Sequence, residues 1–163
     1  MAEKQRLTFD YDAGLTEIYI PATDATIKLN LEDIGLYKRV QDTFEKIDKI
    51  IISFSKSAEE VQKLKSELGE DSDEFLTRVR ELLDQQDQAD KDIRAMLATC
   101  FGFDIASAVF GAMSCLSSCK SAPTVLHSFM EYLGKIYSDS MAKLGAESDK
   151  RIEKYLQKYG KKK

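Results

Sequence analysis

The segment 100–133 constrains the fold of this chain more than any other part of the sequence. It contains only three charged side chains, Asp104, Lys120 and Glu131, in a protein in which 32% of the residues are charged. A segment this apolar has to be covered by the rest of the chain. The sequence on both sides of it has the pattern of long amphipathic helices, which bury their apolar stripes only against such a surface. We therefore expect the segment to form the centre of a mainly α fold.

The first 31 residues have a different pattern, in which apolar and polar residues alternate. This is the period of strands that bury one face. The alternating apolar positions are Leu7, Phe9 and Tyr11, then Ile18 and Ile20, then Ile27, Leu29 and Leu31. Turn-forming residues at 12–14 and 21–24 separate these groups. We predict two or three short antiparallel strands that pack against a helix, because so small a sheet is marginal alone.

Residues 32–100 are predicted to form an antiparallel helical hairpin. The first helix follows a cap at Asn30, ends at Gly69 and repeats its apolar residues every seven positions. One series is Tyr37, Phe44, Ile51 and Ala58, and the other is Val40, Ile47, Phe54, Val61 and Leu68. The second helix begins at Ser72 and keeps the same repeat, with Gln86 as its one polar member. Two consecutive helices of equal period joined by a short link favour an antiparallel pair.

The C-terminal part is predicted to be one more helix, with Ser121 as its cap and Pro123 in its first turn. Glycine weakens a helix, and we expect a kink or break near Gly145. The fold class expected is thus mainly α, with a small N-terminal antiparallel sheet packed on a helical bundle. The predicted single domain comprises a β-hairpin region 1–31, a helical hairpin 32–100, an apolar connecting segment 101–122, a C-terminal helix 123–160 and a basic tail 161–163.

Charge is unevenly distributed along the chain. The net charge is −4, but residues 149–163 carry +5, which leaves −9 on residues 1–148. An acidic body argues against a protein that neutralises phosphates over its whole surface, so nucleic acid is not the expected partner. The tail lysines suit a helix C-terminus, and contact with a polyanion is the alternative. Without a signal-like start or a long apolar span, we expect a cytoplasmic protein with no membrane contact.

Three cysteines and the single histidine lie in or beside the apolar segment, at Cys100, Cys115, Cys119 and His127. Three Cys and one His can form a structural zinc site, and a spacing of four would place Cys115 and Cys119 on one helix face. Paired CxxC motifs are missing, however, and buried thiols are ordinary core residues. We therefore predict no metal or cofactor. A zinc-binding interaction module, or a thiol enzyme with Asp104 orienting the histidine, is the alternative.

The sequence contains no motif of an enzyme active site. It has no glycine-rich phosphate loop, no GxSxG and no HExxH. What remains is the apolar stripe of the long helices, and any part of it left uncovered becomes a contact for a second copy or for another helical protein. The candidate contact residues are Phe44, Ile51, Phe54 and Val61. We expect a non-enzymatic protein that works through such contacts and forms homo-oligomers.

The order of these parts resembles a known family. The residues that carry the resemblance are the strands Thr16–Ile20 and Thr26–Leu31, the acidic Leu31-Glu32-Asp33, the two pairs Phe101-Gly102 and Phe110-Gly111, and the final Phe129-Met130-Glu131-Tyr132-Leu133. In these features the chain is similar to the tail assembly chaperones of long-tailed phages and prophages of Gram-positive bacteria. The two glycines would permit a backbone turn or close helix approach, and the two phenylalanines would fill the space between helices.

The resemblance implies a chaperone that binds the tape measure protein in the host cytoplasm while the phage tail is assembled. This client is a long helical protein that is prone to aggregation. The resemblance implies no catalytic residue and no cofactor. A small phage-encoded inhibitor or regulator that binds a host protein is the alternative, because an acidic surface without catalytic residues would suit it equally.

Overall fold

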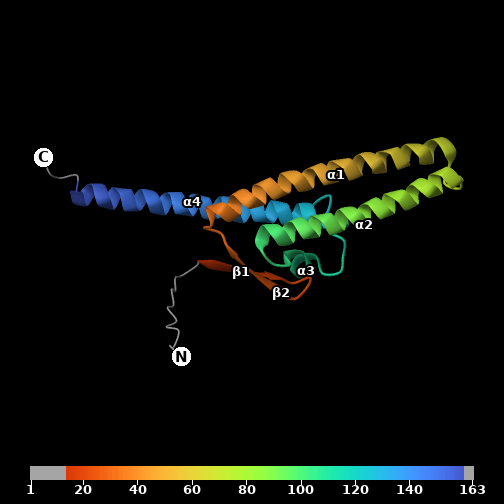
Figure 1. Cartoon of the computed structure of the whole chain (residues 1–163). Helices are drawn as coiled ribbons and strands as arrows, with labels where there is room; N and C mark the ends of the chain where they lie inside the picture. The colour runs from red at the N-terminus through yellow and green to blue at the C-terminus, as the bar shows by residue number, and fades with distance from the viewer. Residues whose placement is uncertain (1–13, 160–163) are drawn as a thin grey trace, which may run out of the picture.

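The computed structural model describes residues 14–159, and the fold is mainly α with a small N-terminal β-hairpin, as predicted (Figure 1). The elements are β1 (Leu15–Ile20), β2 (Ala25–Asn30), α1 (Ile34–Leu68), α2 (Asp73–Phe101), α3 (Ile105–Phe110) and α4 (Val125–Tyr159). The strand predicted around Leu7, Phe9 and Tyr11 and the basic tail 161–163 lie outside the described residues.

The β-hairpin has one buried face, which follows from its alternating sequence. β1 and β2 pair antiparallel, with Ile18 opposite Ile27. Ile18, Ile27 and Leu29 are buried, whereas Tyr19 is exposed and donates a hydrogen bond from its hydroxyl to Asp24 Oδ1 at 2.9 Å. The Thr23 hydroxyl in the turn donates to the carbonyl oxygen of Ala108 in α3. The hairpin is thereby fixed to α3 as well as to the core.

α1 and α2 form the predicted antiparallel hairpin, and most of its end signals act as expected. Gly69 ends α1 with φ +82°, and the Ser72 hydroxyl accepts a hydrogen bond from the Phe75 amide at 3.2 Å to start α2. The prediction for the start of α1 was wrong. Asn30 accepts from the Glu32 amide at 3.0 Å within a turn, and Asp33 occupies the cap position before α1.

α4 is a helix, as predicted, but its first residue and its continuity at Gly145 differ from the prediction. The helix begins at Val125, after Ser121 and Pro123, because the Thr124 hydroxyl accepts a hydrogen bond from the His127 amide at 3.2 Å and so provides the cap. No break occurs at Gly145, and α4 runs unbroken to Tyr159. A penalty of about 1 kcal/mol for one glycine does not interrupt a helix of this length.

The buried core occupies the middle of the molecule. In α1 the last buried residue is Ile47, in α2 the first is Ala89, and in α4 the last is Tyr137. Two helical parts therefore extend from the core in opposite directions (Figure 1). We call residues 48–88, the far part of the α1–α2 hairpin, the arm. We call residues 141–159, the far part of α4, the extension.

Tyr137 is the most voluminous fully buried side chain of the described residues, and its hydroxyl has no hydrogen-bond partner among them. Its ring packs against Tyr37 of α1, with 5.7 Å between the ring centroids. Burial raises the pKa of the Tyr137 hydroxyl to about 12. The side chain therefore contributes apolar packing, while its hydroxyl has lost its contact with water.

Replacing Tyr137 with phenylalanine is expected to stabilise the protein by about 1 kcal/mol at pH 7, because the unpaired hydroxyl is removed. Tyrosine in the unfolded chain loses its proton near pH 10, whereas folded Tyr137 keeps it up to about pH 12. The wild type should therefore lose roughly 2 to 3 kcal/mol as the pH rises through this interval, and Tyr137→Phe should be spared that loss.

Urea unfolding followed by circular dichroism at pH 7, and at intervals from pH 9 to 12, measures both effects. Tyr132→Phe, at an exposed position of the same helix, is the matched control and should leave stability unchanged. A clear destabilisation by Tyr137→Phe would show that the hydroxyl has a favourable partner.

Candidate functional site

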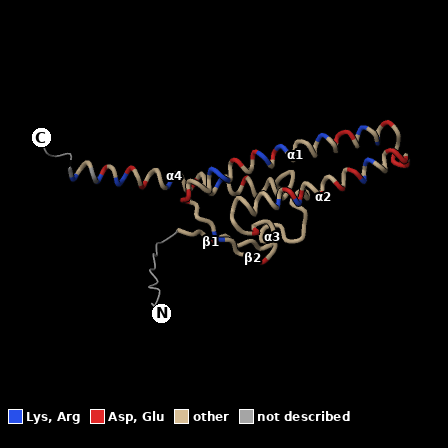
Figure 2. The backbone as a smooth tube through the Cα atoms, viewed as in Figure 1, with Lys and Arg blue, Asp and Glu red and all other residues tan. Residues whose placement is uncertain are grey.

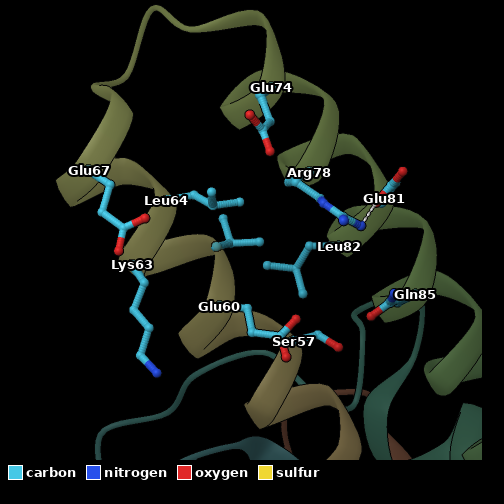
Figure 3. A pocket seen from close by; sticks show the side chains of 11 residues that line it. Ser57, Glu60, Lys63, Leu64, Glu67, Glu74, Arg78, Glu81, Leu82 and Gln85 are labelled. Atoms are coloured by element: carbon cyan, nitrogen blue, oxygen red, sulfur yellow. Dashed lines mark hydrogen bonds and ion pairs between the residues drawn. The ribbon is translucent and has the colours of Figure 1, made fainter.

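A groove runs between the two helices of the arm, and it is the best candidate site for binding another chain. Figure 3 shows Leu64 of α1 and Leu82 of α2 pointing toward each other between the helices. With Val61 they form the apolar floor of a cavity of about 310 Å³. The remaining lining residues are polar or charged, namely Ser57, Glu60, Lys63 and Glu67 of α1 and Glu74, Arg78, Glu81 and Gln85 of α2.

The groove continues toward the core. A second hollow shares Ser57 and Gln85 with the first and is lined further by Ile50 and Phe54 of α1 and by Ala89 of α2. In α1 these positions are separated by three or four residues, so they follow one face of the helix. We call the two hollows together the arm groove. It is long, shallow and apolar at its base, which is a suitable shape for one face of an amphipathic helix.

The rim of the arm groove is acidic. Glu60 and Glu67 lie seven residues apart on α1, and Glu74 and Glu81 lie seven residues apart on α2, so each helix lines the groove with a row of glutamates (Figure 3). Glu81 accepts a hydrogen bond from Arg78 at 2.7 Å, and this contact raises the pKa of the arginine. The exposed carboxylates leave a field that favours a basic partner.

The structure divides the four predicted contact residues into two pairs. Phe54 and Val61 are half-buried and line the arm groove. Phe44 and Ile51 are also half-buried, but they pack against the core. Sequence reasoning missed Leu64 and the four glutamates of the rim. The spacing of seven between the glutamates of each helix was the available signal.

The phenylalanine–glycine pairs lie at helix ends beside the core. Gly102 has φ +78° and ends α2, and Gly111 has φ +58° and ends α3. A Cβ on Gly111 would lie 3.4 Å from Thr23 Cγ2, so this glycine also lets the β-hairpin approach. Phe110 is buried edge-on against Phe129 with 5.8 Å between centroids, whereas Phe101 is half-buried beside Phe103. The pairs shape turns and packing and do not line the arm groove.

The cysteines and the histidine have separate partners. Burial raises the pKa of Cys100, which hydrogen-bonds Thr43. Cys119 donates to the carbonyl oxygen of Ala122 at 3.2 Å, and His127 Nδ1 lies 2.8 Å from the Thr124 hydroxyl. Cys115 and Cys119 do not share a helix face, because residues 111–124 form turns and bends. Within residues 14–159, no three His, Cys, Asp or Glu side chains are grouped so that they could hold a metal ion.

Asp90 and Arg94 form an ion pair that is mostly shielded from solvent, with 2.8 Å between Arg94 Nε and Asp90 Oδ2. Asp90 Oδ1 also accepts from the Cys115 amide at 2.6 Å and from the Ser114 hydroxyl at 3.1 Å. Burial raises the pKa of Asp90, but the hydrogen bonds from Cys115 and Arg94 outweigh this effect and hold it below its usual value. Burial and the neighbouring carboxylate both raise the pKa of the Cys115 thiol. This arrangement opposes a reactive thiolate and serves to attach the connecting segment to α2.

Searches with family models, among curated proteins and among solved structures find no match to this chain. No helix within residues 14–159 has both the length and the hydrophobicity that a membrane-spanning segment needs. The geometry of the arm groove is therefore the main basis for a functional proposal.

Proposed function

We propose that this protein is a non-enzymatic chaperone that binds an amphipathic helix of a client in the arm groove. The single observation that supports the proposal is the groove itself, in which Phe54, Val61, Leu64 and Leu82 stay only partly covered by the two helices of the arm. An uncovered apolar strip of this length on an otherwise charged surface is typical of a contact site.

The proposed mechanism needs no covalent step. The apolar face of the client helix would lie on the floor of the groove, which removes apolar surface of both chains from water. The glutamates of the rim would remain hydrated and keep the complex soluble. Several copies would bind along one long client, so the client would stay soluble even though each contact is small.

The resemblance to the tail assembly chaperones names the client. We propose that it is the tape measure protein, which is long and helical and would be covered in the host cytoplasm until tail-tube subunits displace the chaperone. The α-helical hairpin with its extended groove supports this proposal, because a helical client presents stripes of the same period as the arm.

The proposal is tested by co-expressing the full chain with the tape measure protein of the same tail gene cluster and measuring co-elution by size-exclusion chromatography. Leu64→Glu and Leu82→Glu, made separately on the two helices, should each weaken binding at least about tenfold, because each places a carboxylate against the apolar face of the client.

Ile52→Glu is the matched control. Ile52 is an exposed apolar residue of α1 that lies outside the arm groove, so this variant gains the same charge on the same helix and should bind normally. Circular dichroism verifies that all three variants keep their helix content. Failure of the wild type to co-elute, or equal binding by Leu64→Glu and Ile52→Glu, would contradict the proposal.

A further inference from the structure

The extension carries an apolar stripe that its own molecule does not cover. Ile152 and Leu156 are 54% and 60% exposed, and every described side chain from 145 to 158 is exposed. Leu144, Ile152 and Leu156 are separated by eight and four residues, so they share one side of the helix. An isolated helix of this length is marginal in water, and packing normally supplies the missing stability. The extension therefore presents apolar surface that a partner could cover.

The charge of the extension is opposite to that of the arm. Residues 141–159 contain five basic and three acidic side chains, a net charge of +2, whereas residues 48–88 contain six basic and eleven acidic ones, a net charge of −5. Arg151 follows Leu144 by seven residues and so borders the apolar stripe, whereas Lys143, Lys150 and Lys154 lie together on the opposite side of the helix. Figure 2 shows a group of acidic residues near the turn between α1 and α2, at the far end of the molecule from the extension.

The two parts also match in length. The 19 residues of the extension rise roughly 28 Å, and the 21 residues of α1 beyond Ile47 rise roughly 31 Å. Within one molecule the first half of α4 already contributes to the core that α1 and α2 build, through Leu126, Leu133 and Tyr137. The first half of α4 and this helix pair therefore share one core within the molecule.

We propose that the extension of one copy lies in the arm groove of a second copy and completes a three-helix bundle there. Leu144, Ile152 and Leu156 would cover Val61, Leu64 and Leu82. Arg151, which borders the stripe, would lie near the glutamate rows of the rim, Glu60 and Glu67 on α1 and Glu74 and Glu81 on α2. The interface is heterologous, because it joins the extension of one copy to the arm groove of the other.

This inference rests on the proposed function, because it uses the same groove. It adds that the extension of a neighbouring copy occupies the groove when no client is bound. A client helix would then have to displace the extension of a neighbouring copy. Because the arm and the extension point in opposite directions (Figure 1), each added copy leaves one groove and one extension unfilled, and the row can grow.

Sedimentation velocity over a range of concentrations tests the inference on the full chain. The wild type should associate reversibly. Leu64→Glu, with a blocked groove, and the double variant Ile152→Glu/Leu156→Glu, with a blocked extension, should each lose at least tenfold in self-affinity. An equimolar mixture of the two variants should form a dimer and stop there, because it contains one intact groove and one intact extension per pair.

Ala146→Glu/Gln157→Glu is the matched control, since both residues are exposed on the other side of the extension and the change in charge is the same. It should associate like the wild type. Raising the salt concentration should weaken the mixed dimer, because the opposite charges of the arm and the extension are exposed to solvent.

The inference is overturned if the wild type stays monomeric, if the mixture of blocked variants stays monomeric, or if either blocked variant associates like the wild type. Client binding is measured on Ile152→Glu/Leu156→Glu, whose groove is intact. Failure of the client to bind that variant would count against the proposed function alone, and failure of the mixed dimer would count against self-association alone.

Discussion

Replacing Asp90 with alanine is expected to lower the free energy of unfolding by about 3 kcal/mol. The substitution leaves the amide of Cys115, a residue that is fully buried, without its acceptor at 2.6 Å, and it leaves the shielded Arg94 guanidinium without its counter-charge. Arg94 also donates to the Met113 carbonyl oxygen at 2.6 Å. Displacement of the Arg94 side chain would therefore loosen the connecting segment further. Urea unfolding at pH 7 measures the effect.

Asp87→Ala is the matched control for Asp90→Ala. Asp87 lies on the same helix and pairs with Lys91 four residues later, as Asp90 pairs with Arg94. Both members of the Asp87–Lys91 pair, however, are exposed. Its removal should cost less than about 0.5 kcal/mol. Equal effects at the two positions would show that the buried contacts of Asp90 contribute nothing.

The effect of Asp90→Ala should depend on pH in a definite direction. The pKa of Asp90 in the folded protein lies below its ordinary value of 3.8, so the contribution of the carboxylate is complete above that pH. It disappears as the pH falls through the folded pKa. The difference between wild type and Asp90→Ala should therefore shrink below about pH 4, and a difference that grew on acidification would contradict this account.

Leu133→Ala is expected to cost about 3 kcal/mol, within the range of about 2 to 5 for large apolar side chains removed from a core. Leu133 is fully buried in the cluster that joins α4 to α1 and α2. Leu156→Ala on the same helix, where the side chain is 60% exposed, should change stability by less than about 0.5 kcal/mol. Denaturant unfolding at low protein concentration compares the two variants on monomers. Similar losses at both positions would mean that the extension is packed in the monomer.

The same pair of residues shows how far the sequence predicts this structure. Leu133 and Leu156 belong to one helical stripe, and the stripe predicted the helix correctly. Periodicity identifies which side of a helix is apolar, but it does not identify what covers that side. The division of α4 into a buried half and an exposed half depends on where α1 and α2 lie, and no local pattern contains that information.

The sequence predicted only part of the candidate site, again because periodicity does not identify what covers an apolar side chain. The repeat in α1 indicated Phe54 and Val61 as contact residues, and both line the arm groove. It indicated Phe44 and Ile51 equally, although these pack on the core. The connecting segment was the least predictable part, because residues 111–124 have no periodicity and are held by single contacts such as the Cys115 amide to Asp90.

The position of the core in the middle of the molecule also determines how the native state opens. Ile93 and Leu97 are fully buried, so amide hydrogens around them should exchange with solvent deuterium only when the whole structure unfolds, whereas those near Gly69 or Ile152 should need only local fraying. Deuterium would therefore enter from both ends and reach the centre last. Since the ends are the least protected parts of the free protein, slowing of exchange there would be a sensitive sign that a partner has docked.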